Sequence, residues 1–299
     1  MGLEIIIGLV GLALIFDLYN GMNDAANSIA TVVSTGALTP IAAVVWAAFF
    51  NFAAIFVYGT AVAKTIGSGL VDVNALDASI ELVVFSALMG AIAWAAFATH
   101  TGLPVSISHC LIGGLVGAGV SAGGVAALIW GTPLKGLFST LLFIVVSPLV
   151  GMVLGIALVF LVARLAARRT PGSMAKGFRR LQLFSSAFYS LGHGGNDAQK
   201  TAGIITFLLI GAGMHASTDP IPLWTLLLSY TVIAIGTIAG GWKVIRTLGM
   251  KVTLLRPYQG FAAETGGAIT LAMTATAGIP VSATVAALVF YGARALGVY

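Results

Sequence analysis

Two Asn-Asp pairs, Asn23-Asp24 and Asn196-Asp197, interrupt apolar stretches of this chain, and their flanking sequences are similar. The first lies in the sequence NGMNDAANS and the second in GHGGNDAQKT. The pairs are 173 positions apart (from 23 to 196, and from 24 to 197). A carboxylate inside a membrane segment is costly and is usually functional. The same costly pattern at one internal spacing predicts a transporter built from two repeats, with a polar site where the repeats meet.

The composition favours a membrane protein. Hydrophobic residues make up 59% of the chain and charged residues only 8%, whereas a soluble domain carries roughly 25% charged residues. The net charge of +5 comes from basic residues at segment ends, which indicate topology rather than a nucleic-acid-binding face. The sequence has no ATP-binding loop, no nucleophile elbow and no Cys/His cluster. We therefore expect a secondary transporter and not an enzyme, with no cofactor besides a coupling ion.

The apolar segments predict an all-α polytopic membrane protein. Spans of bilayer length are expected at 40–62, 82–98, 137–162, 223–239 and 260–276. The two Asn-Asp motifs lie inside further apolar segments, 5–33 and 181–210, and we expect each of these helices to be broken near its middle. Irregular backbone at membrane depth is tolerated only where it is buried in protein or faces water.

A second motif repeats at almost the same spacing. The sequence Leu-Pro-Val-Ser with Pro104 resembles Ile-Pro-Val-Ser with Pro280, 176 positions later. The polar, Gly/Pro-broken stretch at 99–109 lies between two apolar helices, which predicts a re-entrant hairpin. Together the two motifs predict two repeats. An uneven number of expected crossings between the first hairpin motif and the basic hinge indicates that the repeats have opposite orientation.

These patterns divide the chain into three parts. We expect a first repeat at 1–163, a basic hinge loop at 164–180 and a second repeat at 181–299. The loops at 164–180 and 243–256 are rich in Lys and Arg, so both are expected on the cytoplasmic side of the cell membrane.

The polar residues suggest two kinds of ligand. Carboxylate and amide oxygens suit a small cation such as Na+, whereas hydroxyls and helix N-termini can donate to an anion. The cation-binding candidates are Asp24 and Asp197, which would hold a Na+ ion directly, with Asn20, Asn27 and Glu264; the anion-binding candidates are Ser106, Ser108 and Thr201. The combination predicts a carrier in which cation binding promotes anion binding. Helix capping by the Asn-Asp pairs and simple helix packing by the serines are the structural alternatives.

The motifs resemble those of the inorganic phosphate transporter (PiT) family. Besides the two Asn-Asp sequences, this holds for GTAVAKTI, GLPVS and GFAAETG, so the resemblance covers nearly the whole chain. It implies a Na+- or H+-driven symporter of inorganic phosphate, with an inverted-repeat fold, two re-entrant hairpins and a homodimeric assembly in the bilayer. It also implies that Asn23, Asn196 and Ser282 contribute to the phosphate site. Sulfate or another tetrahedral oxyanion is the alternative substrate.

The second half departs from the family pattern after Pro280. About 44 residues that would complete a second hairpin have no counterpart when the end of the chain is aligned with 148–160. We therefore expect a shortened second repeat in which 281–296 forms one continuous helix. Such a change would leave Ser282 less well placed, and it raises the alternative of a transport-impaired or channel-like protein.

Overall fold

The computed structural model describes residues 2–165, 170–248 and 255–282. This part of the chain is helical, with short 3-10 turns and isolated bridges between the helices. The α-helices are α1 (Leu3–Ser34), α2 (Pro40–Ala53), α3 (Ala61–Ser68), α4 (Ile80–Thr101), α5 (Ile107–Gly123), α6 (Gly136–Leu165), α7 (Pro171–Gly211), α8 (Leu223–Ala239), α9 (Trp242–Arg246) and α10 (Pro257–Ala277). The predicted all-α class is confirmed.

Several of these helices have the length and composition of membrane spans. Within the described ranges, α1, α4 and α6 are each long and apolar enough to cross a bilayer. The segment from α2 to α3 passes the same test as a pair bent by 80°. Large apolar side chains are exposed along these helices, including Phe49, Phe97 and Phe160, as expected for a surface that faces lipid.

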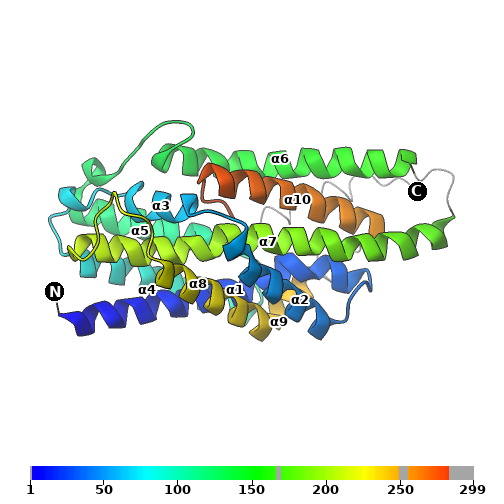
Figure 1. The fold of residues 1–299 in the computed structure, drawn as a ribbon, viewed down its shortest axis with the longest axis horizontal. Coiled ribbons are helices and arrows are strands. Elements are labelled where there is room, and N and C mark those ends of the chain that lie inside the picture. The colour runs from blue at the N-terminus through cyan, green and yellow to red at the C-terminus, as the bar shows by residue number, and fades with distance from the viewer. Residues whose placement is uncertain (1, 166–169, 249–254, 283–299) are drawn as a thin grey trace.

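The order of the helices repeats, and the direction reverses. In each half a long helix is followed by a helix with a short, turned continuation and then by a helix that ends at the Pro-Val motif: α1, α2–α3 and α4 in the first half, and α7, α8–α9 and α10 in the second. Figure 1 shows that α1 runs from left to right and α7 from right to left. The predicted inverted repeats are confirmed.

The predicted breaks in the Asn-Asp helices are absent. Both α1 and α7 are continuous through their motifs. The polar side chains find partners on other helices, for example Asn23 on Thr99, so the backbone need not unwind to satisfy them. Gly21 has a packing role instead: a Cβ at this position would lie 3.1 Å from the Cα of Gly236 in α8.

A break occurs where the sequence predicted the single span 40–62. Helix α2 ends at Ala53, the 3-10 turn η1 (Ala54–Phe56) follows, and the chain turns before α3. Helix α7 supports the new direction, because the Gln199 side-chain oxygen accepts hydrogen bonds from the amides of Val62 and Ala63 at 3.0 and 3.2 Å. These amides belong to the first turn of α3, which has no intrahelical partners for them.

The basic hinge is mostly helix rather than loop. Helix α6 extends to Leu165, and α7 already begins at Pro171, a residue type favoured in the first helical turn. Arg179 donates to the carbonyl of Thr35 at 2.9 Å, beside the C-terminus of α1, where a positive charge is favourable. The second basic stretch is also partly helical, since α9 covers Trp242–Arg246.

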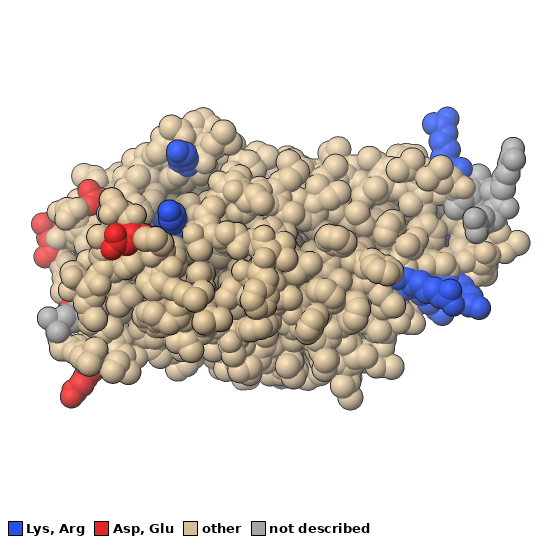
Figure 2. All heavy atoms as spheres, in the orientation of Figure 1, with Lys and Arg blue, Asp and Glu red and all other residues tan. Residues whose placement is uncertain are grey.

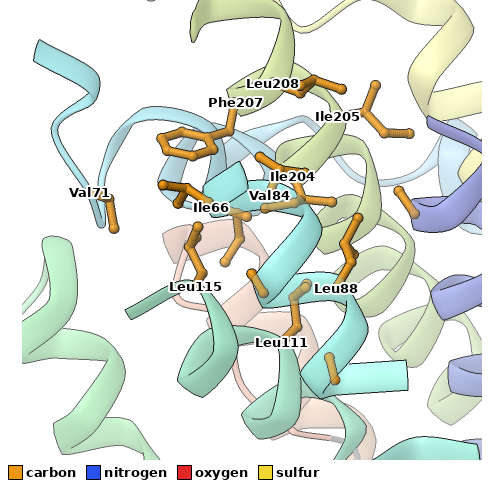
Figure 3. Close-up of a cluster of buried hydrophobic side chains, with 14 of the residues drawn as sticks. Ile66, Val71, Val84, Leu88, Leu111, Leu115, Ile204, Ile205, Phe207 and Leu208 are labelled. Carbon is orange, nitrogen blue, oxygen red and sulfur yellow. The ribbon is translucent and has the colours of Figure 1, made fainter. Parts of the chain in front are cut away.

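An apolar cluster holds the α4–α5 hairpin against α7. Leu88 of α4, Leu111 and Leu115 of α5, and Phe207 of α7 are fully buried in it (Figure 3). The two hairpin arms are joined by 102–106, and Gly102 has a left-handed conformation with φ of 80° at the turn. The hairpin places Ser108, in the first turn of α5, against Asp197 and Lys200 in the middle of α7. The continuous helix predicted at 281–296 lies, apart from its first two residues, outside the described residues.

Candidate functional site

The centre of the molecule brings the two Asn-Asp motifs together. Ligand atoms of Asp24, His193 and Asp197 all lie within 4.8 Å of one another, and the three side chains are fully buried. The Nε2 atom of His193 is 3.1 Å from Asp197 Oδ2 and 3.9 Å from Asp24 Oδ2. Carboxylates from the two inverted repeats thus converge on one imidazole, as the repeated motif predicts, and their oxygens could bind a cation.

A lysine occupies the second-repeat side of this site. The ammonium of Lys200 contacts a carboxylate oxygen of Asp197, the backbone carbonyl of Val281 and, at 2.6 Å, the Ser108 hydroxyl. The side chain is inaccessible to solvent, and no other Lys or Arg among the described residues is buried. A buried ammonium requires compensation of this kind, because desolvation of a lone charge is costly.

The tip of the α4–α5 hairpin reaches the site through its serines. Ser106 caps the N-terminus of α5, where its hydroxyl oxygen accepts a hydrogen bond from the amide of His109 at 3.2 Å. A hydroxyl in that role still has its own proton to donate. Ser108 is fully buried and lies 3.3 Å from Asp197 Oδ1. The two predicted anion ligands therefore differ in their surroundings: Ser108 is bonded to charged groups and Ser106 stands at a helix N-terminus.

The second Pro-Val motif lies at the same site. Asn196 donates to the carbonyl of Ile279 at 3.3 Å and accepts from the amide of Val281 at 3.2 Å. Ser282, the last residue before the segment outside the description, is buried beside them. The side chain of Asn196 is thus bonded to the backbone of the tip, which leaves fewer of its groups for a ligand.

The first-repeat side contains several oxygens without partners. Asn27 donates to Asp24 Oδ1 at 3.1 Å. Along α1, five buried side-chain oxygens have no hydrogen-bond partner among the described residues: Asp17 Oδ2, Asn20 Oδ1, Asp24 Oδ2, Asn27 Oδ1 and Ser28 Oγ. An unsatisfied buried polar atom costs about 1–3 kcal/mol, so a group of them on one helix indicates a ligand. Carboxylate, amide and hydroxyl oxygens form a donor set that suits a small hard cation.

Two predicted residues lie in other surroundings. The Thr201 hydroxyl donates to Asp17 Oδ1 at 2.8 Å, so its proton is directed at a carboxylate of α1. Glu264 accepts hydrogen bonds from Thr31, Ser185 and, at 3.2 Å, Gln182. Thr31 is about two helical turns beyond Asp24, which corresponds to roughly 10 Å along α1. The structure therefore does not bring Glu264 to the Asp pair.

Sequence reasoning left three residues of the site unassigned: Asp17, His193 and Lys200. All three are buried and charged or titratable, and each lies within one or two turns of an Asn-Asp pair. The rule that an ionisable residue within a membrane segment is functional by default would have found Asp17 and Lys200. The repeat spacing carries a further signal, because 173 positions separate Asn20 from His193 and Asn27 from Lys200.

Comparisons with known proteins agree with this architecture. The model of the phosphate transporter family matches residues 20–176 and 166–293. A probable low-affinity inorganic phosphate transporter of Rhizobium meliloti (strain 1021) is 49% identical over 284 residues, which cover 95% of this chain and 83% of that protein. A protein of the same description from Bacillus subtilis (strain 168) is 40% identical, with coverage of 91% and 80%. A solved structure described as the sodium-dependent phosphate transporter superposes with a TM-score of 0.87 at 25% identity, covering 99% of this chain and 91% of that one.

Proposed function

The chain belongs to the phosphate transporter family, and from that premise we propose that it is a symporter, moving inorganic phosphate together with Na+ or H+. It is a membrane transporter and not an enzyme. The coupling ion is the part of the function that the family leaves open. A Na+ ion is favoured by the description of the solved structure, the sodium-dependent phosphate transporter.

One observation carries the coupling proposal: the acidic groups of both repeats converge at the centre of the molecule. Asp24 and Asp197 lie with His193 in one buried cluster. A phosphate anion that binds near this cluster would be repelled by the carboxylates while they are ionised. A cation or proton bound to the cluster removes the repulsion, so that anion binding and cation binding favour each other. This is the thermodynamic requirement for symport.

The same geometry supports separate roles for the remaining polar residues. We assign the cation to Asp24 with Asn20 and Asn27, each of which has one buried oxygen without a hydrogen-bond partner in the described part of the chain. We assign the phosphate to the hairpin tips, where the Ser106 hydroxyl and the N-terminus of α5 present donors.

The charge distribution supports an orientation. In Figure 2 the acidic side chains visible on this face lie at the left end, accompanied by some basic ones, whereas the right end, where α6 ends and α7 begins, shows basic side chains without acidic ones. Cytoplasmic loops carry an excess of Lys and Arg. We therefore place the 164–180 and 243–256 segments in the cytoplasm. A homodimer in the bilayer is part of the same proposal.

Uptake of labelled phosphate into proteoliposomes tests the function. Na+ and pH gradients are imposed separately, and unlabelled sulfate is added as a competitor. We expect uptake driven by one of the two gradients and resistant to an excess of sulfate. Uptake that equilibrates without either gradient would indicate a channel-like protein, and equal competition by sulfate would indicate a general oxyanion carrier.

A further inference from the structure

In the alignment of the two repeats, Lys200 occupies the position that Asn27 occupies in the first repeat. Asn27 follows Asp24 by three positions, and Lys200 follows Asp197 by three positions. Each side chain lies against the carboxylate one turn before it: Asn27 Nδ2 is 3.1 Å from Asp24 Oδ1, and the Lys200 ammonium contacts Asp197 Oδ1. The two repeats therefore have the same framework, with a neutral amide in one and a positive charge in the other.

The ammonium is saturated by protein oxygens. Lys200 has three N–H donors, and it contacts three acceptors: the Asp197 carboxylate, the Ser108 hydroxyl and the Val281 carbonyl. No donor remains for a phosphate oxygen in this arrangement. Lys200 is thus directed at the protein as a bound cation would be, and not at the substrate as an anion ligand would be.

The three acceptors resemble the ligand shell of a monovalent metal cation. A carboxylate, a hydroxyl and a carbonyl of irregular backbone are the oxygen types that coordinate Na+ where hairpins and helices meet in transporters. In the first repeat no ammonium is present beside Asp24, and Asp24, Asn27 and Ser28 each have a buried oxygen without a hydrogen-bond partner within the described residues. The second repeat therefore contains a fixed cation, the Lys200 ammonium, whereas the first repeat presents oxygens to an exchangeable cation.

We propose that the Lys200 ammonium fills the cation site of the second repeat, so that this chain takes up its coupling ion only at the Asp24 site of the first repeat. The inference rests on the proposed symport function and makes it more specific. A tethered charge neutralises Asp197 without entering or leaving with the substrate. The number of cations moved with each phosphate is then one fewer than in a chain with two exchangeable sites.

Replacement of Lys200 by the first-repeat residue, Lys200→Asn, tests this directly. The substitution removes the ammonium and supplies an amide oxygen, so it should open a second site for Na+. The measurement is equilibrium binding of 22Na+ to the purified protein, together with the Na+ dependence of phosphate uptake. We expect about one additional Na+ per chain and a Hill coefficient for Na+ that rises by about one. The control Lys200→Met removes the charge without adding an oxygen, and it should bind no additional ion.

Binding to the unaltered protein provides a second, independent measurement. The proposal expects at most one Na+ per chain; two would overturn it whether or not a variant folds. Two other results would also overturn it. One is that Lys200→Asn, shown to be folded by its thermal unfolding, binds no more Na+ than the parent; the other is that Lys200→Met gains the same additional ion. Failure of the symport proposal has a different signature, because the parent would then show no gradient-driven uptake while the Na+ counts still decide the role of Lys200.

Discussion

At the scale of single residues, the two aspartates of the site are not equivalent. Asp197 is bonded to Lys200, Ser108 and His193, whereas Asp24 has one hydrogen bond from Asn27 and a distant imidazole. Identical motifs in the sequence therefore have different partners in the fold. The same substitution at the two positions should have different consequences.

Asp24→Asn is expected to abolish cation dependence of uptake and leave stability largely intact. Asp197→Asn should abolish uptake and also destabilise the protein by about 3–5 kcal/mol, because it removes the carboxylate of a buried ion pair. The measurements are proteoliposome uptake and thermal unfolding in detergent. Normal gradient-driven uptake in both variants, or equal melting temperatures for the two, would contradict the assignment.

Ser106→Ala and Ser108→Ala are expected to have different effects, on phosphate binding and on stability respectively. Loss of a hydrogen bond to a charged ligand costs roughly 1.5–3 kcal/mol, so Ser106→Ala should lower phosphate affinity on the order of tenfold to a hundredfold. Ser108→Ala removes an acceptor of Lys200, and its main effect should be on stability. Ser106→Thr keeps the hydroxyl and serves as the control. Phosphate affinity within about twofold of the parent in Ser106→Ala would show that this serine only caps the helix.

At the scale of helices, contacts between α1 and its neighbours explain why the polar stretch of α1 stays helical. The sequence predicted a break from Gly21 and the surrounding polar residues, but Gly21 is used for contact with α8 and the polar side chains for contacts between helices. Local sequence cannot distinguish these uses, because the partners are distant in the chain: Thr99 is 76 positions from Asn23, and α8 lies more than 200 positions after Gly21. The bend between α2 and α3 was missed for the same reason, since Gln199 of α7 caps α3.

Gly21→Ala is expected to destabilise the protein by about 1–3 kcal/mol, the usual cost of overpacking, because the added Cβ meets the backbone of Ile233 and Gly236. Gly8→Ala in the same helix is the matched control, as nothing lies within 4 Å of its Cβ position. It should change the free energy of unfolding by less than about 1 kcal/mol. Unfolding in detergent measures both. Equal effects at the two positions would rule out the close approach of α1 and α8.

At the scale of the whole molecule, most of the architecture was accessible from the sequence. Hydropathy predicted the helical membrane class, and the number of expected crossings predicted the inversion. The two motif spacings predicted the repeats and the meeting of Asp24 with Asp197. The chemical environment of each residue was not accessible. It depends on which helices cross at the site. For this reason Ser108 was predicted as an anion ligand or a packing residue, and it is found between Lys200 and Asp197.

The membrane orientation can be checked with single cysteines. In a Cys110→Ala background that retains uptake, Asn74→Cys and Gly177→Cys place exposed thiols near the acidic and basic ends respectively. We expect an impermeant maleimide to label position 74 in intact cells and position 177 only after permeabilisation. The reverse pattern would invert the proposed topology. Labelling of both positions in intact cells would place both ends on the same side.

The bonds between Asn196 and the second tip have a consequence for mutational tolerance. Both bonds use backbone groups of Ile279 and Val281, and backbone groups are present whatever the side chain. The first tip, by contrast, is joined to Asp197 and Lys200 through the hydroxyl of Ser108. Positions 279 and 281 should therefore tolerate substitution by residues of similar size, whereas position 108 must keep its hydroxyl. In a saturation library selected for growth on phosphate, variation should accumulate unequally at the two tips, despite their common motif.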